Sequence, residues 1–563
     1  MFMTAYISAL LGLVGSAVAA GSRNITFQNP VLPGFHPDPS CIFLDDHDGI
    51  FLCATSSFNS FPGIPLHASR DLKNWKLVGH VLNRREQLPA LAETNRSTAG
   101  IWAPTIREHN GDFWVLTTLV IFKGSDPFDD ESWSNAIHFE YEGYDPSPWW
   151  DDDGQAYIVA GHSWRVAYGF SLLQSIDLAE ADLDTGEVGE WRSIWGGTGG
   201  MAPEGPHIYR KDGYHYLIAA EGGTGVGHMV TMARSRDLWG PYEANPANPI
   251  LSNANTTEYF QTVGHADLVQ DGNGNWWCFA LSTRSGPEYL HYPMGRETVL
   301  AAASWEEGQW PTVDPVRGDM TGWPVHPRSG RIPGTGLYTG RDDNLDFPPD
   351  GPLPAHLTHW RFPITASYTP SPPSHPNTLR LLPSRLNLTA LNGNYAGPAG
   401  QTLVSRRQQH TLFRFSVTLD FAPTRQGEEA GVTAFLTQNH HLDLGVVLLP
   451  AEESGALALH WRFRAESYVA VPETLVVPLP EAWTEGKLRL EISAANSTHF
   501  WFSGGPDGRR SEMRTLMVAS NEPVSWGFTG LLLGVYATTN GEDGDTPAYI
   551  SNWQYRGFEQ YLD

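Results

Sequence analysis

Three acidic residues lie in short loops that also contain proline, and their side chains could act together in acid–base chemistry. The loops read His36-Pro37-Asp38-Pro39-Ser40, Tyr144-Asp145-Pro146-Ser147 and Pro203-Glu204-Gly205-Pro206. Proline restricts the backbone, so these side chains should be held in fixed directions. Each acid alone could instead cap a turn, as aspartate often does. Whether the three meet depends on the elements that carry them.

A short pattern recurs five times in the first half of the chain: Asp or Asn, then Gly, then residues typical of a strand. Its dipeptides are Asp48-Gly49, Asn110-Gly111, Asp153-Gly154, Asp212-Gly213 and Asn273-Gly274, with the glycines 62, 43, 59 and 61 residues apart. Such dipeptides favour the turns of β-hairpins. The spacing leaves room for a four-stranded sheet each time and predicts a five-bladed β-propeller over residues 21–330. The alternative is an irregular sandwich with coincidental turns.

The acidic residues occupy matching positions in this repeat. Four residues precede the glycine of their turn by nine positions: Trp102, Asp145, Glu204 and His265. Asp38 precedes Gly49 by eleven, and its longer turn can absorb the two extra residues. If each hairpin begins on the innermost strand of a blade, these positions converge at one mouth of the channel.

Carboxylates that converge on an uncharged, aromatic-lined pocket suit the cleavage of a glycosidic bond. One must be protonated to give a proton to the leaving oxygen, and another must be ionised to activate water. A third raises the pKa of the acid through like-charge repulsion. The 21 tryptophans exceed what a core needs, and flat aromatic faces commonly contact sugar rings.

The motifs resemble glycoside hydrolase family 43, in its members with a C-terminal β-sandwich. The resemblance covers nearly the whole chain, and further segments that carry it are Gly100-Ile101-Trp102-Ala103-Pro104, Glu204-Gly205-Pro206-His207, Gly264-His265-Ala266-Asp267-Leu268 and Gly295-Arg296-Glu297-Thr298. It implies that Asp38 is the general base, Glu204 the general acid and Asp145 the group that tunes the acid. It also implies inversion at the anomeric carbon, for which the two catalytic carboxyls lie about 6.5–9.5 Å apart.

The resemblance also assigns four substrate-binding residues. Phe58 and Trp102 are expected to wall the pocket of the terminal sugar, Arg296 to lie near the carboxylates, and His265 to occupy the channel. Each has a simpler alternative: the two aromatic side chains could be blade core, Arg296 a structural ion pair, and His265 an ordinary hydrogen-bonded histidine. We expect no catalytic metal and no cofactor, although an ion bound in the channel near His265 is compatible with the resemblance.

A stretch rich in proline and glycine separates the repeats from the rest of the chain, and we interpret residues 331–355 as a linker. Strand patterns resume beyond it without the repeat, for example at 412–417 and 442–447. Residues 356–563 should therefore form a second all-β domain. The resemblance makes this domain a concanavalin-like β-sandwich, which in relatives can close one side of the active site.

Residues 1–20 are apolar and end in small residues, which is typical of a secretory signal peptide. Five sequons, at Asn24, Asn95, Asn255, Asn387 and Asn496, fit an extracellular glycoprotein. The net charge of −26 argues against nucleic acids or anionic membranes as partners.

The three cysteines are too few for a disulfide framework. Cys41 and Cys53 flank the first turn, where they could pair or remain two buried thiols. Cys278 lies in a strand pattern of the core.

The sequence is compatible with three functions. The favoured one is an α-L-arabinofuranosidase that trims arabinoxylan; the second is a β-xylosidase acting on xylo-oligosaccharides with the same residues. The third is a glycan-binding protein without activity, which would need neither a base nor a proton donor.

Overall fold

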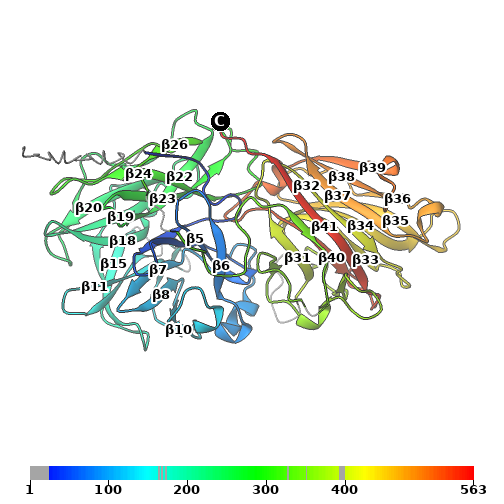
Figure 1. Ribbon diagram of the computed structural model, residues 1–563, viewed down its shortest axis with the longest axis horizontal. Coiled ribbons are helices and arrows are strands. Elements are labelled where there is room, and N and C mark those ends of the chain that lie inside the picture. The colour runs from blue at the N-terminus through cyan, green and yellow to red at the C-terminus, as the bar shows by residue number, and fades with distance from the viewer. Residues whose placement is uncertain are drawn as a thin grey trace, which may run out of the picture.

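The computed structural model describes residues 24–563 except 163–164, 167–168, 171–173, 326–328, 350 and 392–399. The expected signal peptide lies outside these residues. The described chain is built from strands, and its helices are short 3₁₀ turns. Figure 1 shows two β-rich bodies side by side, one coloured blue to green and the other yellow to red.

The first body contains five sheets, each with a path of four antiparallel strands. The strands of the first two sheets are β2 (Ser40–Leu44), β3 (Ile50–Ala54), β5 (Gly63–Ser69) and β6 (Lys76–Leu82), then β7 (Thr105–His109), β8 (Asp112–Thr117), β9 (Val120–Gly124) and β10 (Ile137–His138). The third comprises β11 (Gly143–Trp150), β12 (Ala156–His162), β15 (Ile176–Asp182) and β16 (Glu187–Val188), with β17 (Arg192–Trp195) also on β15. The last two are β18 (Glu204–Lys211), β19 (Tyr214–Glu221), β20 (Met229–Ser235) and β21 (Glu243–Ala244), then β22 (Phe260–Gln270), β23 (Trp276–Arg284), β24 (Glu297–Ser304) and β25 (Thr312–Val313).

The five repeated turns lie where the sequence predicts hairpins. Each joins the first two strands of its sheet, from β2–β3 to β22–β23. The first strands also contact one another in chain order, β2 with β7, β7 with β11, β11 with β18 and β18 with β22, and β22 returns to β2. The five leading strands therefore surround one axis.

Cys41 and Cys53 face each other across the first hairpin and form a disulfide. Cys278 is a buried free thiol. The pairing that the sequence left open is thus settled by the register of β2 against β3.

The second body consists of two packed sheets. One contains β29 (Tyr368–Pro370), β30 (Leu379–Leu381), β41 (Ala548–Glu559), β32 (Leu412–Asp420), β37 (Leu488–Ala494), β38 (His499–Pro506) and β39 (Arg514–Ser520), with β27 (Asp343–Leu345) on β41. The other is β31 (Thr402–Arg407), β40 (Leu532–Thr538), β33 (Glu429–Thr437), β34 (His440–Pro450), β35 (Leu457–Glu466) and β36 (Leu475–Pro478). Alternate apolar residues of both sheets form one core between them.

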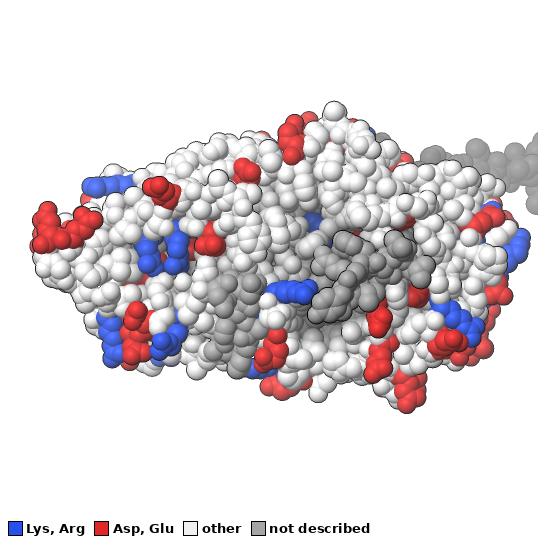
Figure 2. Space-filling view, turned by 180° about the vertical axis from the view of Figure 1, so that it is seen from behind, with Lys and Arg blue, Asp and Glu red and all other residues white. Residues whose placement is uncertain are grey.

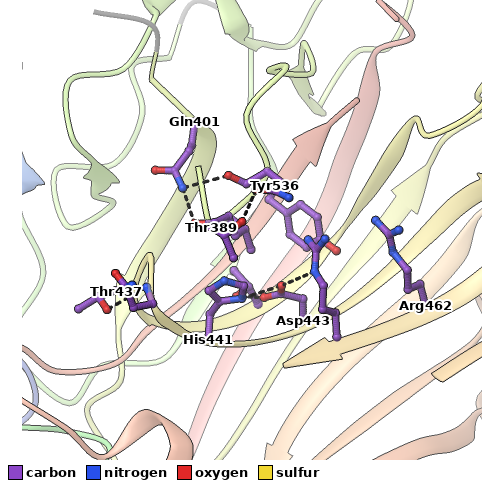
Figure 3. A network of polar contacts seen from close by, with 12 residues as sticks. Thr389, Gln401, Thr437, His441, Asp443, Arg462 and Tyr536 are labelled. Carbon is purple, nitrogen blue, oxygen red and sulfur yellow. Dashed lines mark hydrogen bonds and ion pairs between the residues drawn. The ribbon is translucent and has the colours of Figure 1, made fainter. Parts of the chain in front are cut away.

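The other face of the second sheet carries a buried polar network (Figure 3). Asp443 accepts a hydrogen bond of 2.6 Å from the Thr433 hydroxyl and lies 2.8 Å from Nδ1 of His441. Tyr536 donates to Glu429, which also pairs with Arg462. Because buried polar groups are costly without partners, these contacts allow the face to be covered.

Hydrogen bonds and strand pairing join the two bodies, in addition to the chain that connects them. Lys76 of β6 donates to the backbone carbonyls of residues 332–334, and β27 lies within the expected linker but pairs with β41. β28 (His359–Trp360) pairs with β4 (Ser60–Phe61) of the first body. The segment between the bodies is therefore packed along most of its length.

A buried ion pair supports this junction. Arg284 and Glu297 form two hydrogen bonds of 2.7 and 2.9 Å, and both side chains are 1% exposed. Glu297 also accepts from the backbone N–H of Gly34, and Arg284 donates to Gln560 and Tyr561 near the chain end. One ion pair thus ties the loop before Asp38 to the second body.

Glu297→Gln should lower the free energy of unfolding by about 3–5 kcal/mol, because it leaves the Arg284 charge buried without its counter-charge. Urea unfolding followed by tryptophan fluorescence measures the change. Glu258→Gln, which breaks a partly exposed pair with Arg317, is the matched control and should cost less than about 1 kcal/mol. Equal losses in both variants would contradict the role given to Glu297.

Candidate active site

Asp38 lies in the loop before β2, at a backbone φ of +53°. It is 5% exposed and accepts two hydrogen bonds from Arg296, at 2.7 and 3.1 Å, and one from Ser56 at 2.6 Å. Burial alone would raise the pKa of Asp38, but Arg296, His265 and Ser56 outweigh it and lower the pKa below its ordinary value. Asp38 is therefore ionised at neutral pH.

Asp145 and Glu204 lie at the starts of neighbouring leading strands, β11 and β18. The pairing register shifts at both residues, so each strand has a bulge there. Bulges re-aim side chains and occur often beside active sites. The backbone N–H of Gly205 donates to Asp145 at 3.1 Å, which links the two acidic residues.

The position after Glu204 requires glycine because the ring of His265 lies against it. The φ of Gly205 is +58°, and a Cβ there would lie 2.8–3.0 Å from atoms of the His265 ring. Any larger residue would displace the histidine or the strand. This close approach explains why glycine follows Glu204.

The pKa values of Asp145 and Glu204 move in the same direction. Burial, and then the negative charge of Asp38, raise the pKa of Glu204 to about 7. Burial and the charge of Glu204 raise the pKa of Asp145 well above its ordinary value. Two carboxyls whose charges act on each other in a desolvated site do not both ionise readily, so the pair holds a proton at neutral pH.

His265 lies between the acidic residues. Its Nδ1 is 3.9 Å from Asp38 and 4.0 Å from Asp145, and burial lowers its pKa. The structure thus brings Asp38, Asp145 and His265 together, as the repeat predicts. No group of three or more His, Cys, Asp or Glu among the described residues is arranged to hold a metal ion. The ion near His265 remains a prediction.

Aromatic rings line the same region. The Phe58 ring lies 6.5 Å from that of Trp102, whose other neighbour is Tyr144 at 6.5 Å. Phe58 itself is 3% exposed, whereas Trp102 is partly exposed. Trp102 therefore presents the accessible surface, with Phe58 packed behind it.

The second body adds a residue that the sequence reasoning missed. Phe528 stacks on Phe58 at 6.4 Å with an angle of 11° between the rings, and it is 37% exposed. Its carbonyl accepts a 3.0 Å hydrogen bond from Nε of Arg296. No sequence motif predicts Phe528 as a site residue, because it is 232 residues from Arg296 in the chain and only the packing of the two bodies brings them together. Trp553, near the chain end, is fully buried in the sandwich core and does not reach the site.

Tyr144 is a further neighbour that the sequence did not single out, although it adjoins Asp145. Burial and the charges of Glu204 and Asp145 raise its pKa above the ordinary value, so its hydroxyl remains a donor. Arg296 is likewise held from two sides, since it also donates to Thr224 at 3.1 Å. The site therefore combines an ionised carboxylate, a carboxyl pair that holds a proton, and aromatic surface, the set that acid–base cleavage of an acetal requires.

Comparison with known proteins agrees with this chemistry. The profile of glycosyl hydrolases family 43 matches residues 27–311, and that of the beta xylosidase C-terminal concanavalin A-like domain matches residues 346–556. The chain belongs to glycoside hydrolase family 43. It is a glycosidase with the C-terminal concanavalin-like domain of that family, as the motifs predict.

Family 43 relatives match over most of their length. The non-reducing end alpha-L-arabinofuranosidase BoGH43B of Bacteroides ovatus is 32% identical over 97% of both chains. A xylosidase/arabinosidase of Butyrivibrio fibrisolvens is 33% identical over 92% of this chain and 97% of its own. The crystal structure of a xylan beta-1,4-xylosidase from Bacillus halodurans superposes with a TM-score of 0.79 at 28% identity, covering 94% of this chain and 100% of that one.

Arg296→Gln should move the acidic limb of the pH profile of kcat/KM upward by about one unit or more, because Arg296 is the strongest influence lowering the pKa of Asp38. An Asp38 with a raised pKa is protonated, and so inactive as a base, over a wider pH range. The profile is measured on an aryl glycoside. Arg317→Gln, at an exposed pair, should leave the limb in place; an unmoved limb in Arg296→Gln would contradict the influence given to that residue.

Proposed function

We propose that Asp38, Glu204 and Asp145 hydrolyse a terminal glycosidic bond with inversion. The observation that carries this is the contrast between a buried and a half-buried carboxyl: the pKa of Asp38 is lowered, and that of Glu204 is raised to about 7. A base must be ionised and an acid protonated at the working pH. We assign to Asp145 the tuning of the acid, which it contacts through the backbone N–H of Gly205 and with which it shares the proton of the pair.

The reaction proceeds in one displacement. Asp38 removes a proton from a water molecule, whose oxygen forms a bond to the anomeric carbon as the bond to the leaving oxygen breaks. Glu204 gives its proton to that oxygen. The products are an inverted sugar and a free hydroxyl, and both carboxyls then exchange protons with solvent. The expected carboxyl separation of about 6.5–9.5 Å provides room for the water.

We further infer that the five sheets are the blades of a propeller, with the site at one mouth of its channel. The closed order of contacts among the leading strands supports this reading. Phe528 from the sandwich would then close one side of the pocket, where Trp102 and Phe58 form another wall. A pocket closed in this way favours a terminal sugar over the middle of a polymer.

We propose that the protein is an α-L-arabinofuranosidase and that its substrate is arabinoxylan. The similarity to the Bacteroides ovatus arabinofuranosidase over 97% of both chains supports it. A β-xylosidase acting on xylo-oligosaccharides is the second candidate, since the Butyrivibrio relative is named for both activities and the Bacillus halodurans structure for the second. The non-catalytic alternative is set aside, because the chain belongs to a family of hydrolases.

Export from the cell is part of the proposal. The apolar start of the chain and the five sequons support it, and Asn24, Asn95, Asn255 and Asn496 are exposed. Among the described residues, no helix is long and apolar enough to cross a membrane. On the face drawn in Figure 2, acidic and basic side chains are scattered among uncharged residues, which suits a neutral polysaccharide as substrate.

Glu204→Gln should lower kcat/KM about 10³-fold on an aryl glycoside with a poor leaving group, because general acid catalysis typically contributes 10²–10⁴-fold. On the 2,4-dinitrophenyl glycoside, whose leaving group needs no proton, the loss should be about tenfold or less. Asp38→Asn is the comparison, since loss of the base should be equally severe on both substrates. Equal losses for Glu204→Gln on the two substrates would contradict its role as the acid.

The released sugar decides between the two substrates. The full-length protein should release arabinose, and no xylose, from arabinoxylan, and should leave xylobiose intact. Anion-exchange chromatography of the products measures this, with Glu204→Gln as the blank. Xylose released from xylobiose would select the β-xylosidase instead.

A further inference from the structure

A second pocket, distinct from the site of the carboxylates, lies between the two bodies behind the Asp38 loop. Its deep wall is formed by His36 and His67 of the first body and Arg407 of β31. Its mouth is at Leu337, Tyr338 and Arg341, which are exposed. The cavity has a volume of about 30 Å³, which is room for at least one water molecule or halide ion.

The charge of this pocket is opposite to that of the protein. Three arginines and three histidines line it, namely Arg341, Arg406, Arg407, His36, His67 and His356, with no acidic residue among the lining side chains. The whole chain carries a net charge of −26. The positive potential is therefore local and arises from the arginines.

Arg406 is neutralised, but Arg407 is not. Arg406 pairs with Asp343 at 2.8 Å and donates to Gln409 at 3.0 Å. Arg407 is 6% exposed, its Nε donates only to the carbonyl of Phe35, and its Nη2 has no hydrogen-bond partner among the described residues. No described acidic side chain forms an ion pair with it, and burial lowers its pKa to about 10, so it is still charged at neutral pH. A buried charge without a counter-charge is strongly unfavourable.

Two further nitrogens in the same wall lack partners. Nε2 of His36 and Nδ1 of His67 are buried without a hydrogen bond to any described residue, and their rings pack edge to face at 4.6 Å. Burial lowers the pKa of both histidines, so each is neutral and can donate one N–H. Water could satisfy these nitrogens, but it would leave the Arg407 charge uncompensated.

We propose that this pocket binds a single small inorganic anion, chloride, held by the Arg407 guanidinium and by ring N–H groups of His36 and His67. The anion supplies the missing counter-charge and bridges the two bodies. Sulfate and phosphate are the alternative occupants that the test distinguishes from chloride. The proposal does not rest on the hydrolytic function, because the anion takes no part in the reaction.

The thermal midpoint Tm of the full-length protein should rise by about 2 °C or more between 1 and 100 mM chloride, because a ligand that binds only the folded state stabilises it. Ionic strength is held constant with sodium gluconate, whose anion exceeds the cavity, and sulfate is tested in parallel. The rise should saturate with chloride and be absent with sulfate. A midpoint that depends only on ionic strength would overturn the proposal.

Arg407→Gln should abolish the chloride dependence, whatever its own effect on Tm. Arg385→Gln, which breaks an exposed pair with Asp543, is the matched control and should retain it. A chloride response retained by Arg407→Gln would contradict the site. Should that variant not fold, crystals of the unaltered protein grown in bromide decide the question: an anomalous peak beside the Arg407 guanidinium supports the proposal, and water alone at that position refutes it.

Discussion

The bidentate contact between Arg296 and Asp38 is the interaction on which the rest of the site depends. Asp38 precedes the first strand of the first sheet, and Arg296 directly precedes β24 of the fifth. The contact therefore connects the beginning and the end of the five-sheet body. Because both side chains are buried, the attraction is little screened, and it keeps Asp38 ionised despite the unfavourable effect of burial.

The same arginine connects this chemistry to the second body. Its Nε donates to the carbonyl of Phe528, whose ring stacks on Phe58. The next residue, Glu297, binds Arg284 and thereby the chain end. Two adjacent side chains thus connect the loop that carries Asp38 to the second body. Substitutions that weaken the contacts between the two bodies should therefore also alter the position of Asp38.

The backbone of the leading strands imposes a second constraint. Asp38, Asp145 and His265 all have φ near +50°, and at the remaining two positions the next residue has a positive φ, +31° at Ala103 and +58° at Gly205. Such values are uncommon for residues other than glycine and persist only where surrounding structure holds them. The repeated distortion re-aims side chains that would otherwise follow the regular alternation of a strand.

The sequence by itself was enough for the five hairpins, the all-β class and the convergence of Asp38, Asp145 and His265, because turn chemistry and strand spacing are local properties. The roles of the carboxyls came from family motifs, and they remain proposals supported by the opposite pKa shifts of Asp38 and Glu204. Phe528 and the Arg407 pocket could not be found in this way, because each depends on which surfaces of two bodies meet. Only the tertiary structure decided those contacts and the burial that shifts the pKa values, because burial and charge separation depend on distance in space rather than along the chain.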